Sequence, residues 1–526
     1  MVKEDGKLLS FAGSIPASNC ALYCNREENF MLDIMKQEAN RAYTENGAAT
    51  WATSGSDCLD LFAAIGALRR ESDEEIIDRF VRAYTENPDI AMKLLFYARD
   101  VRGGLGERRV FRTILRWLAI NESAAVKKNL TYVAEYGRYD DLLTLFDTPC
   151  EQDMLELIRR QFVCDMENLA ADESVSLLAK WLPSVNASNT QTIQYGRKMA
   201  RAMGMKDAEY RKALSKLRTR INLIENHLRE KDYSFAYEKQ PSRAMFKYRR
   251  AFARNDGERY QEFLARVHSG ESRLHADHVF PYELVEACLY TNWNWNQTGW
   301  MKPVTSDEKA ALNAAWKALP DYGNHENTIA VIDTSGSMYM DARPIPAAVA
   351  LSLGMYLAER NKGVFRNHFI EFSDRPQLIE IKGETFTDRL RYITTFCEVA
   401  GTNLEAVFDL ILDAAVKHNV SQEEMPAKLM IISDMEFNAC VENAEETNFD
   451  HAKKKYAAWG YQLPEIVFWN VASRNRQQPV TMNEQGVALV SGMTPRLFAM
   501  AAGGKFSPYT FMLEILGSAR YAKIAA

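Results

Sequence analysis

The sequence lacks the features that mark membrane, secreted and disulfide-stabilised proteins. It contains no uninterrupted apolar stretch of about 18 residues, the length that a membrane-spanning helix requires. Residues 1–7 do not lead into the apolar core of a signal peptide. The 8 cysteines are scattered along the chain, which is typical of reduced thiols. We therefore expect a cytoplasmic protein without a membrane segment.

The sequence also lacks the common motifs of nucleotide-binding and hydrolytic enzymes. There is no Walker-type phosphate loop and no Gly-x-Ser-x-Gly nucleophile elbow with a following acid and His. The pair Gly104-x-Gly106 does not follow an expected strand and lacks the third glycine of a dinucleotide site. We expect a non-enzyme with no nucleotide cofactor. Metal-dependent phosphoryl chemistry would need a base near Ser337, and Glu436 is the candidate that stands nearby.

The 526 residues are too many for one hydrophobic core, and their pattern changes part-way along the chain. From about residue 28 to residue 300, apolar residues recur at helical spacing, as in 73–86, 108–119, 152–169 and 207–229. After residue 322, strand-like and helical segments alternate, which predicts a doubly wound α/β domain. The expected fold is thus α + α/β: an all-helical, HEAT-like repeat array over residues 1–322, followed by a Rossmann-like domain over 323–526.

The strands of the second domain are expected at 328–333, 366–372, 376–381, 427–433, 465–471 and 486–490. Helices are expected between them at 345–360, 384–395, 403–417, 447–459 and 507–519. Ligands of such sheets bind at the carboxyl ends of the strands.

The most informative motif is Asp-Thr-Ser-Gly-Ser at residues 333–337, directly after the apolar run 329–332. That run predicts a buried parallel strand, so the motif falls in the loop at its carboxyl end. One carboxylate and two hydroxyls in a tight turn offer the oxygen ligands that Mg²⁺ prefers. A Ser- and Gly-containing turn after a core strand is the simpler alternative.

This motif resembles the metal-ion-dependent adhesion site of von Willebrand factor A domains. That family adds a Thr from a second loop and an Asp from a third, and Thr402 and Asp434 stand at the matching positions. The resemblance implies that Ser335, Ser337 and Thr402 contact a Mg²⁺ or Mn²⁺ ion directly. Asp333 and Asp434 would act largely through bound water. One coordination position would stay open for a carboxylate or phosphate oxygen of a docking protein partner.

The helical half resembles the TROVE module of Ro-related proteins. The resemblance rests on Asn46-Gly47-Ala48, on the Leu-Phe-Ala-Ala-Ile-Gly segment at 61–66, and on the Arg-Asp-x-Arg-x-Gly-x-Gly-Glu-Arg pattern around residues 99–108. Segments 241–245 and 275–283 are more similar to an uncharacterised sister family of TROVE-like proteins, found also in viruses and phages. TROVE modules bind small structured RNAs and the ends of misfolded RNAs, so the resemblance implies an RNA partner.

Three arginines surround the Gly-rich turn at residues 103–106 and are candidates for holding RNA phosphates: Arg99, Arg102 and Arg108. The alternative is a helix corner in which Arg99 pairs with Asp100 or Glu107.

A second group of candidates lies in residues 196–274, which carry 20 Lys and Arg against 10 Asp and Glu although the whole chain has a charge of −6. Arg211 and Arg218 share a face of the expected helix at 207–229. Lys247, Tyr248, Arg249 and Arg250 place cations beside an aromatic ring, which suits single-stranded RNA. The alternative is a solvated face neutralised by acidic neighbours.

These observations favour an RNA-binding scaffold whose second domain docks a protein partner through a metal ion. The alternative is a protein-interaction scaffold that uses the same metal site to bind a partner carboxylate and carries no RNA.

Overall fold

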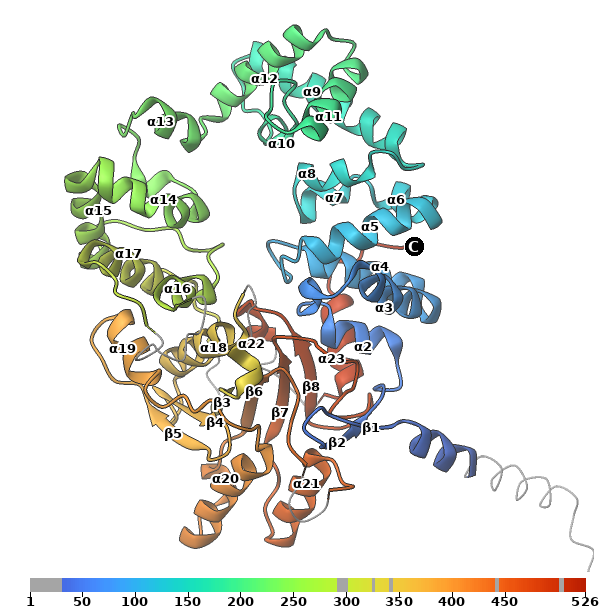
Figure 1. Cartoon of the computed structure of the whole chain (residues 1–526), viewed down its shortest axis with the longest axis vertical. Helices are drawn as coiled ribbons and strands as arrows, with labels where there is room; N and C mark the ends of the chain where they lie inside the picture. Colours follow the sequence, from blue (N-terminus) through green and yellow to red (C-terminus); the bar gives the residue numbers. More distant parts are fainter. Residues whose placement is uncertain (1–30, 291–300, 324–326, 340–343, 440–443, 501–505) are drawn as a thin grey trace, which may run out of the picture.

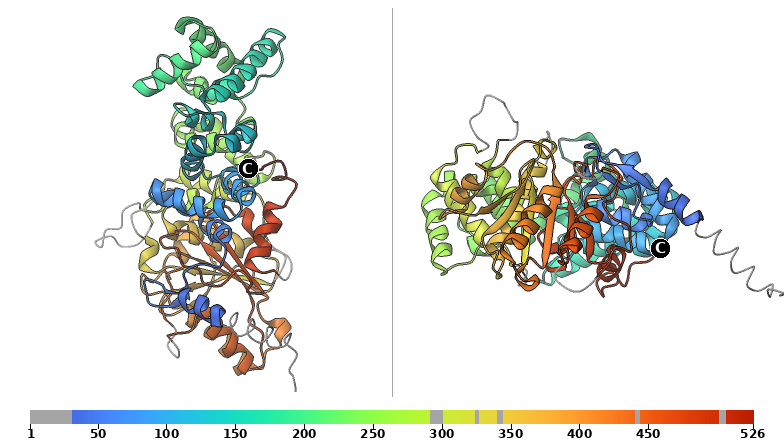
Figure 2. Two further views of the ribbon diagram at one scale, coloured as in Figure 1. Left: turned by 90° about the vertical axis from the view of Figure 1, so that its right-hand side faces the viewer. Right: turned by 90° about the horizontal axis from the view of Figure 1, so that it is seen from below.

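The structure is a computed structural model that describes residues 31–290, 301–323, 327–339, 344–439, 444–500 and 506–526. In this part of the chain an arch of helices rises from a domain that contains a six-stranded sheet (Figure 1). Seen from the side, the arch stands above the sheet domain (Figure 2, left). The expected α + α/β architecture is confirmed.

The arch begins with α2 and ends with α17. Its α-helices are α2 (Asp57–Ala64), α3 (Asp73–Glu86), α4 (Pro88–Arg99), α5 (Arg109–Asn121), α6 (Ser123–Asn129), α7 (Tyr132–Tyr136), α8 (Tyr139–Leu142), α9 (Glu151–Ala170), α10 (Leu178–Trp181), α11 (Thr190–Ala202), α12 (Asp207–Ile221), α13 (Ile224–Glu230), α14 (Ser242–Asn255), α15 (Gly257–Ser269), α16 (Pro281–Cys288) and α17 (Ser306–Lys317).

Local sequence explains where these helices begin and end. In α3 the buried residues Ile76, Phe80 and Ala83 recur at helical spacing, and the Ser72 hydroxyl caps the first turn by accepting a hydrogen bond from the Glu75 N–H. The expected single helix over 207–229 is instead two helices. The break falls at Asn222, whose left-handed backbone (φ 55°) ends α12.

The sheet contains β3 (Thr328–Asp333), β4 (His368–Phe372), β5 (Gln377–Glu380), β6 (Lys428–Ser433), β7 (Glu465–Asn470) and β8 (Val487–Ser491), in the spatial order β5-β4-β3-β6-β7-β8. All neighbours are parallel except β4 and β5. The domain's helices are α18 (Pro346–Arg360), α19 (Phe386–Ile393), α20 (Leu404–His418), α21 (Asn448–Ala458), α22 (Arg496–Met500) and α23 (Pro508–Leu516). The chain order reverses between β3 and β6, and doubly wound sheets bind ligands at such a reversal.

Both ends of the arch are fastened to the sheet domain. At the first end, the Gly66 N–H donates to the Ser491 hydroxyl at 2.9 Å, which places the end of α2 against β8. At the other end, the Ile345 N–H donates to the Glu286 carboxylate of α16 at 2.8 Å. The arch is therefore supported at both ends, as Figure 1 shows.

The expectation of an entirely helical first domain is wrong at residues 41–51. These residues form a hairpin of β1 (Arg41–Tyr43) and β2 (Ala49–Trp51) that lies against the sheet domain. The Trp51 N–H donates to the Gln478 carbonyl at 3.0 Å, and the Gln478 N–H donates back to the Trp51 carbonyl at 2.7 Å. Strands of three residues are too short to show an alternating pattern, and Gln478, which binds Thr50 and Trp51 of β2, lies more than 400 residues later in the chain.

No helix in the described ranges combines the length and the apolar character needed to cross a bilayer. The prediction that no signal peptide is present concerns residues 1–30, which lie outside the described residues.

Candidate metal centre and basic surfaces

Asp333 ends the central strand β3 and is fully buried. One carboxylate oxygen accepts a hydrogen bond from the Ser335 N–H at 2.8 Å, and the other accepts one from the Ser433 hydroxyl at 2.5 Å. Burial raises the pKa of Asp333, and the hydrogen bonds from the two serines oppose that rise. The Ser335 and Ser337 hydroxyl oxygens lie 3.2 Å apart in the turn that follows.

Asp434 directly follows β6, the neighbour of β3, so its carboxylate is at the same edge of the sheet. Burial raises the pKa of Asp434 to about 7, and the negative charge of Asp333 contributes to the rise. The Ser337 hydroxyl donates a hydrogen bond to Asp434 and acts in the opposite direction. Four of the five predicted metal ligands are therefore connected to one another by hydrogen bonds or charge.

Thr402, the fifth predicted ligand, lies in the loop before α20. This loop reaches the motif because the Gly336 N–H donates to the Ala400 carbonyl at 3.2 Å. It also contacts the loop after β6, where the Asn438 N–H donates to the Thr402 carbonyl at 2.8 Å. The Thr402 hydroxyl oxygen is buried, and it has no hydrogen-bond partner among the residues that the structure describes. A buried hydroxyl without a partner is costly, and the Thr402 oxygen is available as a donor to a ligand.

The three loops together offer two buried carboxylates and three hydroxyls. Within the described residues, no group of three or more His, Cys, Asp or Glu side chains is placed to hold a metal ion. Any ion held at this edge of the sheet would therefore depend on the hydroxyls of Ser335, Ser337 and Thr402 as well as on carboxylates. That donor set suits a hard cation such as Mg²⁺ or Mn²⁺ and does not suit a soft one.

A further buried carboxyl group, which sequence reasoning missed, lies beside this cluster. Glu371 of β4 accepts a hydrogen bond from the Thr334 hydroxyl. Burial raises the pKa of Glu371 to about 7, and the hydrogen bond from Thr334 opposes the rise. The sequence signal was a single charged residue inside the apolar strand 368–372.

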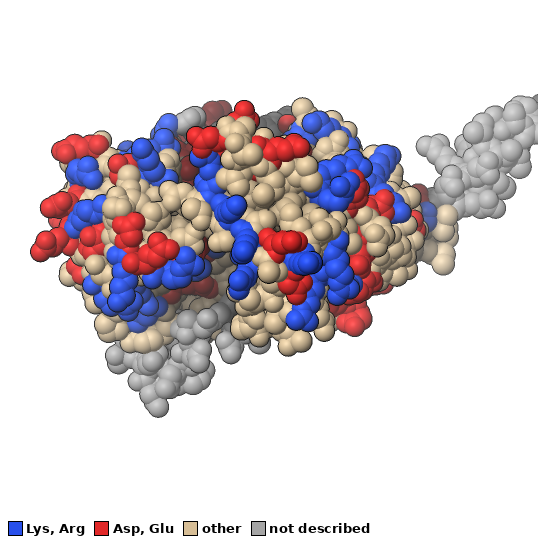
Figure 3. All heavy atoms as spheres, turned by 90° about the horizontal axis from the view of Figure 1, so that it is seen from above, with Lys and Arg blue, Asp and Glu red and all other residues tan. Residues whose placement is uncertain are grey.

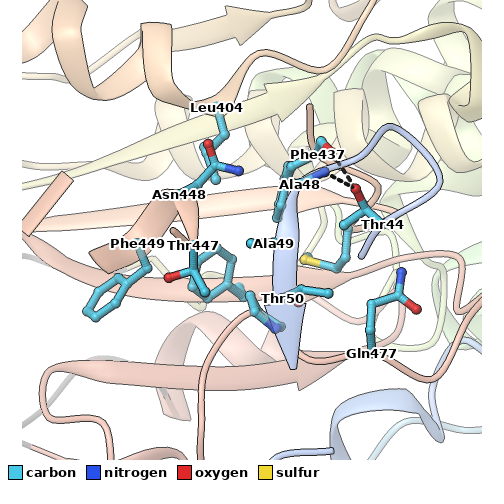
Figure 4. A pocket seen from close by; sticks show the side chains of 13 residues that line it. Thr44, Ala48, Ala49, Thr50, Leu404, Phe437, Thr447, Asn448, Phe449 and Gln477 are labelled. Atoms are coloured by element: carbon cyan, nitrogen blue, oxygen red, sulfur yellow. Dashed lines mark hydrogen bonds between the residues drawn. The ribbon is translucent and has the colours of Figure 1, made fainter. Parts of the chain in front are cut away.

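Two hollows lie beside the N-terminal hairpin, and the smaller one is lined in part by Leu404 and Met435, close in sequence to Thr402 and Asp434. A small cavity of about 10 Å³ lies between the β1–β2 hairpin and the sheet domain, near Thr44, Thr50 and Phe437 (Figure 4). Its size suits a water molecule. Inside it, the Thr44 hydroxyl donates to the Phe437 carbonyl at 2.6 Å. A larger hollow of about 680 Å³ lies between the hairpin and α21.

Comparison with known proteins places the chain in a family. The sequence profile described as Domain of unknown function (DUF2828) matches residues 44–169 and 139–322, which together are more than half of the chain. The chain belongs to the DUF2828 family. A second profile, Domain of unknown function (DUF7788), matches residues 327–506 of this DUF2828 protein.

Two individual proteins are similar over most of their length. The "Uncharacterized protein L728" of Acanthamoeba polyphaga mimivirus is 27% identical over 520 residues, which cover 91% of this chain and 87% of the viral protein. The crystal structure of the Deinococcus radiodurans Ro (RSR) protein is 14% identical, with a TM-score of 0.35, and the match covers 88% of this chain and 93% of that one. At this TM-score the likeness carries no argument about function.

In this DUF2828 protein, the prediction that Arg99 holds RNA phosphate is wrong. The Arg99 side chain is 2% exposed, and its guanidinium pairs with the buried carboxylate of Asp141 at 2.7 Å. The expected partners, Asp100 and Glu107, bind Arg520 and Arg69 instead. Arg99 therefore stabilises the packing of α4 against α8.

Arg218 and Arg249 are likewise occupied within the protein. The guanidinium of Arg218 donates to the Ala179 and Leu182 carbonyls, at 2.8 Å each, and thereby satisfies the C-terminal end of α10. Arg249 is 13% exposed and pairs with Glu308 of α17 at 2.9 Å. Their helical spacing is as expected, but both side chains turn towards neighbouring helices.

The remaining predicted RNA contacts differ in accessibility. Arg102, Arg108 and Arg211 are exposed, and Arg250 is 66% exposed although it pairs with Glu308. Lys247 lies over the Tyr248 ring at 4.7 Å, so this cation covers one face of the only ring in the predicted set. Arg250 shares α14 with Lys247 and Tyr248, whereas Arg102 and Arg108 lie around the turn before α5 and Arg211 lies on α12. The predicted contacts are therefore divided among separate regions of the arch.

Proposed function

We propose that this protein is a non-enzymatic scaffold whose sheet domain binds one Mg²⁺ or Mn²⁺ ion and, through it, an acidic group of a protein partner. The observation that carries the proposal is the buried Thr402 hydroxyl, which lacks a partner in the described residues although it lies beside the Ser335–Ser337 turn. Its position at the reversal point of the sheet, next to Asp333 and Asp434, agrees with a cation site.

The residues fit such an ion in number and chemistry. Ser335, Ser337 and Thr402 would hold it through neutral hydroxyls, while Asp333 and Asp434 would balance its charge. When bound, the cation would supply a positive centre for an oxygen of the partner's acid. Because three of the donors are neutral and Mg²⁺ loses its water reluctantly, we expect weak binding.

The protein's own residues fix the arrangement before any ligand arrives. Ser433 and the Ser335 N–H hold the two oxygens of Asp333, so that carboxylate cannot rotate without breaking both bonds. The loop contact between Gly336 and Ala400 holds the Thr402 loop next to the turn. Such restraint lowers the ordering cost of binding.

Replacement of Asp333 tests this proposal. Asp333→Asn keeps the side-chain shape and removes the charge, so Mn²⁺ binding measured by calorimetry should be lost while the circular dichroism spectrum stays unchanged. The matched control is Asp153→Asn on α9, an exposed aspartate paired with Lys127. Unchanged Mn²⁺ affinity in Asp333→Asn would rule out this site. A partner held through the ion should dissociate when a chelator is added.

RNA binding by the arch is a second proposal, favoured by exposed cations on α12. Arg211, Lys212 and Lys216 are exposed, and within the described ranges none of them has an ion-pair partner. Lys and Arg side chains gather in a line across the face seen from above (Figure 3), and α12 lies in this upper part of the arch. Unpaired cations on a helix suit an RNA backbone.

The salt dependence of RNA binding tests this second proposal. Replacing Arg211, Lys212 and Lys216 together with Ala should flatten the logarithmic salt slope by about 2 units, because each phosphate contact on a single strand contributes about 0.7. Lys453→Ala with Lys454→Ala, on the exposed surface of α21, is the control. The wild-type protein is tested first in a filter-binding titration at low salt. If it retains no RNA there, the alternative that stands is a scaffold that binds a protein partner and no RNA.

A further inference from the structure

Arg474, in the loop after β7, connects the candidate metal centre to the N-terminal hairpin. Its Nη1 lies 3.2 Å from a carboxylate oxygen of Asp434, and its Nη2 pairs with the Glu45 carboxylate of the hairpin turn. The Asp434 side chain is 1% exposed, that of Arg474 25%, and that of Glu45 49%. The three charges therefore form a chain that runs from the buried site to the surface.

The hairpin is held in this position by the loop that contains Asp434. The Glu436 carboxylate accepts a hydrogen bond from the Glu45 N–H at 2.7 Å, and its carbonyl accepts one from the Asn46 side chain at 2.6 Å. Asn475 bridges the two acids, because its side-chain amide lies 3.0 Å from the Glu45 carboxylate and 2.8 Å from that of Glu436. Glu45 is thus an ordered part of the rim of the site, although it lies 391 residues before Glu436.

The guanidinium of Arg474 has enough donors to serve two acids at once, and Asp434 and Glu45 are two such acids of the protein itself. The inner acid, Asp434, is buried and cannot leave. The outer acid, Glu45, is half-exposed, and an exposed ion pair of this kind contributes only about 0–1 kcal/mol. A carboxylate arriving from solvent would therefore meet a cation whose outer partner can be exchanged.

We propose that Arg474 is a specificity-determining residue of the metal site, which pairs with the carboxylate of a docking protein, and that Glu45 is an internal competitor for it. The proposal rests on the function proposed above for Asp333 and its neighbours. It adds that the site selects an acid able to reach both the bound ion and the guanidinium. It also makes the hairpin part of the docking site, because Glu45 must release Arg474 when the partner binds.

Acetate binding to the Mn²⁺-loaded full-length protein tests this proposal. The affinity is measured from the broadening of the acetate methyl proton signal, after the Mn²⁺ affinity of each variant has been determined. Glu45→Gln should tighten acetate binding, and Arg474→Gln should weaken it, each by up to about fivefold, the range expected for an exposed charge pair. In the double variant, Glu45→Gln should have no effect, because its competitor role acts through Arg474.

Two controls separate this mechanism from a general effect of charge or folding. Glu230→Gln removes an exposed acid on α13, paired with Arg229, and should leave acetate affinity unchanged. Glu45→Asp keeps the charge on a shorter side chain. Its acetate affinity and its stability therefore show whether a change at residue 45 disturbs the hairpin even when the charge is kept. Equal acetate affinity in the wild type, Glu45→Gln and Arg474→Gln would overturn the role of Arg474 while Mn²⁺ binding stands. Absence of Mn²⁺ binding in the wild type would overturn the proposed function and this inference together.

Discussion

Arg476 and Glu75 join the sheet domain to the arch through an ion pair with two contacts. The Arg476 Nε donates to a Glu75 carboxylate oxygen at 2.9 Å, and an Arg476 terminal nitrogen contacts the other oxygen. Glu75 also pairs with Arg79 of its own helix at 2.7 Å. The hydrogen bond from Arg476 is the largest cause that lowers the pKa of Glu75, from an ordinary 4.5 to about 2.

This pair predicts a stability difference that depends on pH. Because the folded-state pKa of Glu75 is below its unfolded value, its stabilising effect is complete above pH 4.5 and is lost as pH falls towards 2. Arg476→Ala should lower the free energy of unfolding by about 1 kcal/mol at pH 7, and the difference from wild type should shrink below pH 4.5. Urea unfolding at pH 7, 5 and 3.5 measures this difference in the free energy of unfolding. Arg229→Ala is the control, because it removes one partner of an ion pair on the exposed surface. A difference that grows on acidification would contradict the assignment.

Thr402→Val tests whether the Thr402 hydroxyl binds the metal ion or stabilises the fold. Valine has nearly the same shape, and the Thr402 hydroxyl has no partner in the described residues, so its removal should leave the free energy of unfolding unchanged or raise it by about 1 kcal/mol. Mn²⁺ affinity should nevertheless fall, because one of the oxygen donors is gone. Thermal unfolding without metal and Mn²⁺ calorimetry give the two readings. A destabilised variant with normal Mn²⁺ affinity would show that the hydroxyl has a structural role instead.

Gly66 controls how closely the first end of the arch approaches the sheet. A Cβ at this position would lie 2.5 Å from the Ser491 carbonyl oxygen, which is backbone and cannot move aside cheaply. Gly66→Ala should therefore destabilise the protein by about 1–3 kcal/mol, as overpacking usually does. Gly257→Ala is the matched control, because a Cβ there would meet nothing within 4 Å. Differential scanning calorimetry compares the two, and equal melting temperatures would refute the close contact.

Arg99 should affect stability more than Arg108, although both belong to the same sequence pattern. Arg99→Ala leaves the fully buried Asp141 with one cation fewer, at a cost of about 3 kcal/mol or more. Arg108→Ala removes an exposed cation that has no ion-pair partner within the described residues, so stability should change little. Chemical unfolding of both variants checks this order. Equal stability of the two variants would contradict the buried pairing of Arg99.

The sheet domain was predictable from the sequence because its elements are encoded locally. The strand expected at 328–333 is β3, and the helix expected at 345–360 matches α18 closely. The order of Asp333, Thr402 and Asp434 at loop positions was also readable, since a buried strand and the polar residue that ends it are adjacent in the chain. Whether these residues bind a metal remains a prediction.

Which charged side chain pairs with which was not predictable in the same way. Arg99, Arg102 and Arg108 look equivalent in the sequence, yet the first is buried against Asp141 while the other two are exposed. Burial depends on the neighbouring helix that covers a residue, and periodicity shows only which face the residue occupies. The same limit applies to Arg218, whose acceptors are the carbonyls that end another helix.

The sequence by itself determined the class of the two halves and the position of the motif at the end of β3, because helical spacing, strand-like runs and turn residues act between near neighbours. Only the tertiary structure decided that Glu45 and Arg474 meet at the edge of that motif. Their pairing joins a hairpin of two three-residue strands to a loop more than 400 residues later. Such a contact is set by how whole elements pack, which no local pattern records.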